Sequence, residues 1–309
     1  MKRDFQRRAP VSRERETGSA SGVLKTTGAW ICGPYRLHYK RRPLVMGILN
    51  VTPDSFSDGG FFLNPERAVE QAVRMVEAGA DLIDVGGEST RPGALPVSLE
   101  EEGRRVLPVL ERLAKKLKVP LSIDTTKSKL ARRAVEAGAS IINDVSGFTR
   151  DPEMFSVAAK EKTGLVIMHA KGTPQTMQRR PYYRNLIEEI HRFFKVQIGR
   201  AADHHIPRSR IAIDPGIGFG KTARHNLQIL RRLDRFLDLG APVMVGPSRK
   251  SFIGQILGLP PSDRLEGTAA AVAIAVLHGA RILRVHDVAE IARVVRVAEA
   301  IRSEEIAHG

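Results

Sequence analysis

The sequence predicts a closed barrel of eight parallel β-strands, each followed by a helix. From Leu44 onward, short β-rich runs alternate with segments of helical periodicity, and eight such units in about 260 residues match the size of a (β/α)8 TIM barrel. The strands are continuous apolar runs, as expected when both faces of a sheet are covered. An open doubly wound sheet is the alternative. It is disfavoured because no G-x-G-x-x-G follows the first strand, and polar residues follow nearly every strand.

The elements can be assigned in chain order. Residues 30–40, WICGPYRLHYK, are expected to form a short hairpin ahead of the barrel, because Gly33-Pro34 is a turn signal. The barrel strands are expected at 44–49, 81–86, 121–125, 141–145, 164–169, 211–214, 242–246 and 282–286.

Amphipathic segments fill most of the intervals between these strands. Gly79 and Gly138 each follow such a segment and are expected to end a helix. The expected helices lie within 65–80, 99–117, 128–139, 184–205, 225–237, 264–279 and 287–302.

Composition limits the class of protein. A hydrophobic fraction of 42% is enough for a large core. The sequence contains no run of eighteen apolar residues, the length that would suggest a membrane span. The basic start is followed by polar residues, which disfavours a secretory signal. The single cysteine, Cys32, agrees with a reducing, cytoplasmic location. We therefore expect a disordered basic leader over residues 1–28 and one barrel domain over 29–309.

The net charge of +15 raises the possibility of a nucleic-acid-binding or scaffold protein. About half of that charge lies in the first 42 residues, which carry eleven Lys or Arg against three Asp or Glu. Aromatic residues, which would stack on bases, make up only 5% of the chain. An anionic small-molecule substrate explains a basic folded part equally well.

Polar residues follow every expected barrel strand. Any one of them could be an ordinary turn or helix-cap residue. Eight clusters, all at the carboxyl ends of strands, indicate instead the catalytic face of a barrel. The clusters include Asn50 and Asp58, Asp84 to Arg91, Asp124, Asn143 and Asp144, Met168 and His169, Asp214 to Lys221, Gly246 to Ser251, and Arg284 to Asp287.

The chemistry of these clusters divides the face in two. Asp124, Asn143 and Asp214 could hydrogen-bond to the edge of a planar, nitrogen-rich heterocycle. The cations after the last two strands suit phosphate, which barrels often bind there. Asn50 together with a ligand phosphate suits Mg²⁺. We interpret His169 as a packed, hydrogen-bonded residue, and no H-E-x-x-H or C-x-x-C supports zinc.

The motifs also resemble those of a known family. They are NVTPDSFSDGG (50–60), GGESTRPGA (86–94), SIDTTKS (122–128), INDVSG (142–147), VIMHAKGTPQTMQ (166–178), DPGIGFGKT (214–222), SRKSFIG (248–254) and RVHDV (284–288). In this order and spacing, they strongly resemble the dihydropteroate synthases of folate biosynthesis.

The resemblance implies a pterin-binding barrel that condenses 7,8-dihydropterin-6-ylmethyl diphosphate with p-aminobenzoate, giving dihydropteroate and diphosphate. It implies Mg²⁺ on Asn50, and a homodimer formed through the last helices. The implied catalytic residues are Asp58, Asp214 and Lys250. The implied substrate contacts are Asp124, Asn143, Asp214 and Lys250 for the pterin, Arg91, Arg284 and His286 for the diphosphate, and Thr90, Pro92, Phe219, Lys250 and Ser251 for p-aminobenzoate, with Phe56 closing over it. Met168 and Gly246 are also expected to bind substrate.

A second pterin-binding barrel, a methyltetrahydrofolate:corrinoid methyltransferase, is the nearest alternative. It would share the heterocycle pocket but would not need the anion contacts at Arg249-Lys250 and Arg284. No cobalamin-binding module is evident in the sequence. Diphosphate release that requires p-aminobenzoate and magnesium would separate the two activities.

Overall fold

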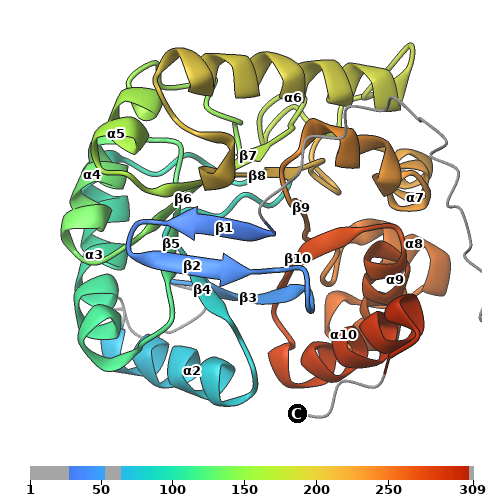
Figure 1. Cartoon of the computed structure of the whole chain (residues 1–309), viewed down its shortest axis with the longest axis horizontal. Helices are drawn as coiled ribbons and strands as arrows, with labels where there is room; N and C mark the ends of the chain where they lie inside the picture. Colours follow the sequence, from blue (N-terminus) through green and yellow to red (C-terminus); the bar gives the residue numbers. More distant parts are fainter. Residues whose placement is uncertain (1–27, 53–63, 306–309) are drawn as a thin grey trace, which may run out of the picture.

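The computed structural model describes residues 28–52 and 64–305, and it contains the closed eight-stranded parallel barrel that the sequence predicts (Figure 1). The strands are hydrogen-bonded in chain order, and β10 closes the barrel against β3. They are β3 (Leu44–Asn50), β4 (Leu82–Gly86), β5 (Leu121–Asp124), β6 (Ile141–Asp144), β7 (Gly164–Met168), β8 (Ile211–Asp214), β9 (Val243–Val245) and β10 (Ala280–Val285).

Helices surround this barrel. They are α2 (Pro65–Glu77), α3 (Leu99–Lys116), α4 (Ser128–Glu136), α5 (Met154–Lys160), α6 (Leu186–Asp203), α7 (Ala223–Arg231), α8 (Ser251–Leu257), α9 (Leu265–Leu277) and α10 (Val288–Ser303). Within the described ranges, no helix is long and apolar enough to cross a membrane.

Local sequence explains where several helices begin and end. Asn64, Ser98 and Asn185 are N-caps whose side chains accept backbone N–H bonds in the first turn. Gly79 and Gly138 follow α2 and α4 with φ of +105° and +109°, a backbone conformation that favours glycine. Both glycines therefore end helices, as the sequence predicts.

Three details differ from the expectations. The short helices α5 and α8 were not predicted, because one or two turns carry too little periodicity to be recognised. The helix expected over 225–237 ends at Arg231 and continues as a 3-10 helix over Leu233–Leu239. These differences leave the barrel order unchanged.

Side chains alternate between the two faces of the barrel wall, and the inward face changes character along its length. Near the amino ends of the strands, the inward residues form an apolar cluster that includes Met46, Leu82, Ile141, Val166, Ala212, Met244 and Ile282. Because the side-chain period of a strand is two, the next inward positions are Ile48, Asp84, Asn143, Met168, Asp214, Gly246 and Arg284. The outward residues pack with the helices in the larger core.

The predicted hairpin covers the apolar end of the barrel. β1 (Ala29–Cys32) and β2 (Tyr35–His38) pair antiparallel and lie across that end in Figure 1. Trp30 is completely buried there, and its Nε1 donates to the carbonyl of Arg210 at 3.0 Å. Hairpin and barrel interior thus share one core, which leaves the opposite end open for ligands.

Candidate active site

The carboxyl ends of β4, β5, β6 and β10 meet in a buried ion-pair network. Arg284 Nε donates to Asp84 Oδ2 at 2.6 Å, and its Nη2 donates to Asp124 Oδ2 at 2.8 Å. Asn143 Nδ2 donates to the same Asp84 oxygen at 3.0 Å. Burial raises the pKa of Asp124, and the charge of Arg284 opposes that rise. Asp124, Asn143 and Arg284, all predicted substrate contacts, therefore meet around Asp84, for which the motifs predict no individual role.

Asp214 ends β8 beside this network. Its Oδ1 accepts from the backbone N–H of Gly216 at 2.7 Å. Gly216 has φ of +70°, and a Cβ there would lie 2.0 Å from the carbonyl oxygen of His169, so only glycine fits. Burial raises the pKa of Asp214 to about 6, against the opposing effects of the Gly216 hydrogen bond and the Lys250 charge.

The network and Asp214 together line the polar end of the barrel interior, which we call the pit. Lys250 lies in the loop after β9 and faces this pit. Its Nζ lies 4.2 Å from the centroid of the Phe219 ring, within cation–π range. Burial and the Arg284 charge lower the pKa of Lys250 to about 8, against the opposing effects of Asp214 and Asp124. These electrostatic partners put Lys250 close to the carboxylates, with an aromatic face on one side.

A second buried lysine supports the loop that carries Phe219. Lys221 Nζ lies 3.0 Å from His169 Nδ1, and it donates to the carbonyls of His169 at 3.1 Å and Phe219 at 3.0 Å. Burial lowers the pKa of His169 to about 2 and that of Lys221 to about 7. His169 is thus packed and hydrogen-bonded, as its sequence context suggests.

His286 lies at the other edge of the pit, after β10. Ser248 Oγ accepts from the His286 backbone N–H at 3.3 Å and lies 3.0 Å from its Nδ1. Burial, followed by the Arg284 charge, lowers the His286 pKa to about 3, so the ring is neutral at physiological pH. If the Ser248 hydroxyl donates to Nδ1, Nε2 carries the proton and can donate to a ligand. The neighbouring Arg249 is instead ion-paired with Asp287.

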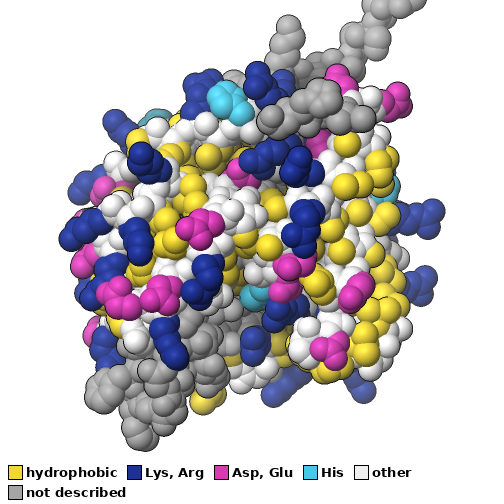
Figure 2. All heavy atoms as spheres, turned by 90° about the horizontal axis from the view of Figure 1, so that it is seen from below, with side chains coloured by type: hydrophobic (Ala, Val, Ile, Leu, Met, Phe, Trp, Pro, Cys, Tyr) yellow, Lys and Arg dark blue, Asp and Glu magenta, His cyan; other side chains and the backbone are white. Residues whose placement is uncertain are grey.

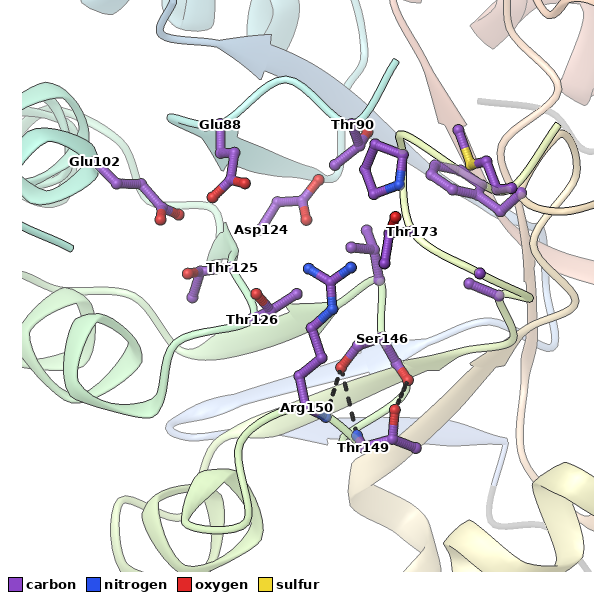
Figure 3. Close-up of a pocket in the computed structure, with 16 residues that line it drawn as sticks. Glu88, Thr90, Glu102, Asp124, Thr125, Thr126, Ser146, Thr149, Arg150 and Thr173 are labelled. Carbon is purple, nitrogen blue, oxygen red and sulfur yellow. Dashed lines mark hydrogen bonds between the residues drawn. The ribbon is translucent and has the colours of Figure 1, made fainter. Parts of the chain in front are cut away.

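A cavity of about 690 Å³, open to solvent, extends from the pit toward β5, β6 and β7. In Figure 3, Thr90 and Asp124 lie on one side of it and Arg150 rises from the other. The loop bearing Thr90 is fastened to the loop after β7, because Gly93 N donates to the Pro174 carbonyl at 2.9 Å. Phe219 also lines this cavity, and its ring is the one that the Lys250 ammonium contacts.

An ion triad secures the root of that loop. Lys127 bridges Glu88 in the loop and Glu102 in α3, and Glu102 is completely buried. Arg105 Nη1 also donates to the Gly87 carbonyl at 2.9 Å. Beyond this root, Arg91 and Pro92 are exposed.

The described residues contain no group of three His, Cys, Asp or Glu side chains that could hold a metal ion. Asn50 nevertheless lies at the rim of the pit. A Cβ built on Gly86 would be 3.9 Å from Asn50 Oδ1 and 3.8 Å from Asp124 Oδ2, so the glycine leaves room between them. One amide oxygen beside a carboxylate fits Mg²⁺ only if ligand phosphates and waters complete the coordination.

Most predicted site residues come together at this end of the barrel. Met168 and Gly246 lie at inward strand ends, while Ser251 is exposed at the start of α8. Phe56 and Asp58 lie outside the described residues. The signal that could have identified Asp84 is a charged residue at an inward position of an otherwise apolar strand, LIDVG.

Comparisons with known proteins agree with this geometry. The model of a family described as pterin binding enzyme matches residues 46–286. Dihydropteroate synthase of Synechocystis sp. is 50% identical over 84% of this chain and 91% of its own length, and that of Escherichia coli K12 is 48% identical over 84% and 92%. The chain belongs to the dihydropteroate synthase family. It is a transferase of folate biosynthesis that makes dihydropteroate.

Solved structures of the family share its fold. The Yersinia pestis dihydropteroate synthase in a sulfonamide drug complex has a TM-score of 0.84 at 45% identity, covering 89% of this chain and 99% of its own. The Xanthomonas albilineans enzyme with 4-aminobenzoic acid has a TM-score of 0.83 at 45% identity, covering 89% and 98%. This family membership confirms the barrel and the activity that the motifs imply.

Proposed function

We propose that the pit binds the ring of 7,8-dihydropterin-6-ylmethyl diphosphate and that the cavity beside it admits p-aminobenzoate. The observation that carries this assignment is the buried network of Asp124, Asn143 and Arg284, with Asp214 beside it. Carboxylate and amide oxygens accept hydrogen bonds, and a pterin edge is rich in N–H donors. Buried polar groups of this kind strongly disfavour ligands that leave them unpaired.

Asp214 is suited to hold the ring edge and to stabilise charge. Since Gly216 occupies its Oδ1, Oδ2 is the oxygen that would accept from the ring. Met168 and Gly246, at neighbouring strand ends, would bound the ring on its apolar side. Asp58 retains its proposed catalytic role in stabilising the same charge, although it lies outside the described residues.

The amine substrate is assigned to the Lys250 side of the pit. Phe219 offers a ring face, and Thr90 lines the cavity next to it. Pro92 and Ser251 would complete this site, with Phe56 as the proposed cover. One solved relative, the Xanthomonas albilineans enzyme, is described with 4-aminobenzoic acid.

We assign the diphosphate to the hydrogen-bond donors at the open end of the pit. Arg284 has no partner for Nη1 among the described residues, and neutral His286 can donate through Nε2. Arg91, exposed in the Thr90 loop, would close on the same group. Asn50 would hold Mg²⁺ together with diphosphate oxygens. When bound there, the metal ion would neutralise charge on the leaving group.

The reaction then needs little proton chemistry from the protein. The bond between the methylene carbon and the diphosphate oxygen breaks, and diphosphate departs with the electron pair. The electron-rich pterin carries the developing positive charge, which the Asp214 carboxylate stabilises. The neutral amine of p-aminobenzoate forms the C–N bond and releases one proton. Lys250 positions the substrates and requires no role as a base.

We assign the interface of a homodimer to the last helices of the chain. Ile256, Ile274, Leu277, Val297 and Ile301, from α8, α9 and α10, are each at least 43% exposed. Hydrophobic side chains gather along the right-hand edge of Figure 2, the side on which these helices lie in Figure 1. Apolar surface of this kind marks protein interfaces, so we assign a homodimer to this face.

Sedimentation tests the homodimer. The wild type should sediment at twice the chain mass of 34.0 kDa, and Ile274→Glu combined with Ile301→Glu should give monomers. Val196→Glu, which changes an exposed apolar residue of α6, is the matched control and should leave the dimer intact. A monomeric wild type at micromolar concentration would rule out this interface.

We also propose a cytoplasmic location, since the pathway substrates and the one buried thiol suit a reducing compartment.

The activity itself is tested by product balance. Purified protein supplied with pterin diphosphate should release one diphosphate for each dihydropteroate, and only when p-aminobenzoate is present. Removing Mg²⁺ with a chelator should stop the release, and adding it back should restore it. Methyl transfer from methyltetrahydrofolate without diphosphate release would instead support the corrinoid methyltransferase alternative.

A further inference from the structure

One carboxylate oxygen in the barrel interior links three strands. Asp84 Oδ2, on β4, accepts from Arg284 of β10 at 2.6 Å and from Asn143 of β6 at 3.0 Å. In the barrel order, β6 and β10 each stand two strands away from β4. Both hydrogen bonds therefore cross the interior instead of running along the wall. Asp84 is completely buried, so neither donor can exchange it for water.

Asp84 determines which end of the Asn143 amide faces the ligand. A carboxylate only accepts hydrogen bonds, so Asn143 must turn its Nδ2 toward Asp84. Its Oδ1 is then directed elsewhere, and it is buried without a hydrogen-bond partner among the described residues. An unpaired buried acceptor is costly, and a ligand N–H removes that cost.

Asp84 also holds the Arg284 guanidinium in one plane. Nε is bound to Asp84 and Nη2 to Asp124, so the planar group is held at two points. Among residues 28–52 and 64–305, Nη1 has no partner and is the nitrogen left to donate. Asp84 thus fixes an acceptor at Asn143 and, together with Asp124, a donor at Arg284.

We propose that Asp84 is a positioning residue that sets the hydrogen-bond polarity of the ring pocket. It selects ring ligands that donate at the Asn143 position, and it rejects rings of the same shape that accept there. This role rests on the proposed use of the pit as the pterin site. It deepens that proposal by naming the residue that determines ring specificity without contacting the ring.

The test compares a pterin with the corresponding lumazine, in which a carbonyl oxygen replaces the exocyclic amino group. Calorimetry gives the ratio of the two dissociation constants for the wild type and for Asp84→Asn. An asparagine at 84 can donate or accept, so the Asn143 amide becomes free to turn over. We expect the preference for the pterin to fall at least tenfold. A ratio within threefold of the wild type would overturn the role of Asp84.

A swapped variant separates positioning from folding. In Asp84→Asn combined with Asn143→Asp, residue 143 again offers only acceptors, and the total charge is unchanged. The pterin preference should return to within threefold of the wild type, and failure to return would contradict the proposal. If Asp84→Asn alone does not fold, the swapped variant provides the test. A ratio of pterin to lumazine dissociation constants within threefold of the wild type supports the proposal, and a larger change contradicts it.

The control and the parent activity keep the outcomes distinct. Asp81 lies just before the other end of β4 and pairs with Arg42, so Asp81→Asn removes a charge near the same strand but away from the pit. It should leave the ratio unchanged. A wild type that forms no dihydropteroate would contradict the proposed function. A working wild type whose ratio is insensitive to Asp84→Asn would contradict only this inference.

Discussion

The two ends of the barrel interior are made by the same strands yet have opposite chemistry. Near the amino ends, Leu82, Ile141 and Ile282 lie in a fully buried apolar cluster beneath the β1–β2 hairpin. Two residues further along the same strands, Asp84, Asn143 and Arg284 form a polar network. One repeat of the strand period therefore separates the part that stabilises the barrel from the part to which we assign substrate binding.

The comparison also shows how a polar end can be tolerated. Each fully buried apolar side chain stabilises the fold by about 1.5–3 kcal/mol. Buried charges are costly unless they are paired. The pit pairs Arg284 with two carboxylates, while Asn143 Oδ1 and Asp84 Oδ1 have no hydrogen-bond partner within the described part of the chain. The apolar end therefore offsets incomplete pairing at the end that must receive a ligand.

The largest effect is expected where pairing at the polar end is broken. Arg284→Met leaves Asp84 and Asp124 buried without their cation, and removing one partner of a buried ion pair costs about 3–5 kcal/mol. Product formation should also fall by about 100-fold or more. Urea unfolding and a dihydropteroate assay measure the two effects.

Arg42→Met is the control for that change. Its pair with Asp81 is half-exposed at the opposite end of the barrel, so its loss should cost about 1 kcal/mol or less. An equal decrease in the free energy of unfolding for the two variants would show that stability does not depend more strongly on charge pairing at the polar end.

At the apolar end, an effect of similar size on stability is expected, without the loss of product formation. Trp30→Ala should lower the free energy of unfolding by about 3–5 kcal/mol, because a large buried side chain and its hydrogen bond to Arg210 are lost. Trp30→Phe, which retains most of the volume, should cost about 1 kcal/mol. The KM values of both variants should match the wild type at temperatures where they are folded. A raised KM for either substrate would show that the two ends are coupled.

The smallest effect is a pH window for ligand binding. Burial raises the pKa of Asp214 to about 6 and lowers that of Lys250 to about 8. Below pH 6 Asp214 gains a proton, so that it loses its charge and one of its oxygens becomes a donor. Above pH 8 Lys250 loses its charge. Pterin diphosphate affinity should therefore be highest between these values and fall up to about tenfold per pH unit outside them.

Calorimetry from pH 5 to 9 measures this window. Lys250→Met should abolish the part of the alkaline decline that comes from the protein while keeping the acidic decline. A flat profile in the wild type would contradict the assignment of both groups to the ring pocket.

The sequence predicts the barrel because its signals are local and repeated. Apolar runs, helix caps such as Asn64 and terminal glycines such as Gly138 each appear within a few residues. The same regularity places the polar residues at one end, since parallel strands bring their carboxyl ends together. The short helices α5 and α8 escape prediction because a single turn or two has little periodicity.

The pairing inside the site could not be predicted from the sequence. Arg284 is implied as a diphosphate contact, whereas in the structure two of its nitrogens are occupied by Asp84 and Asp124. No local sequence pattern distinguishes a residue that faces the ligand from one that faces another side chain. That distinction depends on distances across the barrel, between strands separated by as many as 200 positions.

The β1–β2 hairpin has a practical consequence for following how this molecule opens. It places the chain's one cysteine, Cys32, completely out of solvent, where burial raises the pKa of the thiol well above its usual value. A thiol in that state reacts with alkylating or disulfide reagents only after the hairpin detaches. The labelling rate of the natural, unmodified chain therefore reports directly how often this cap lifts away.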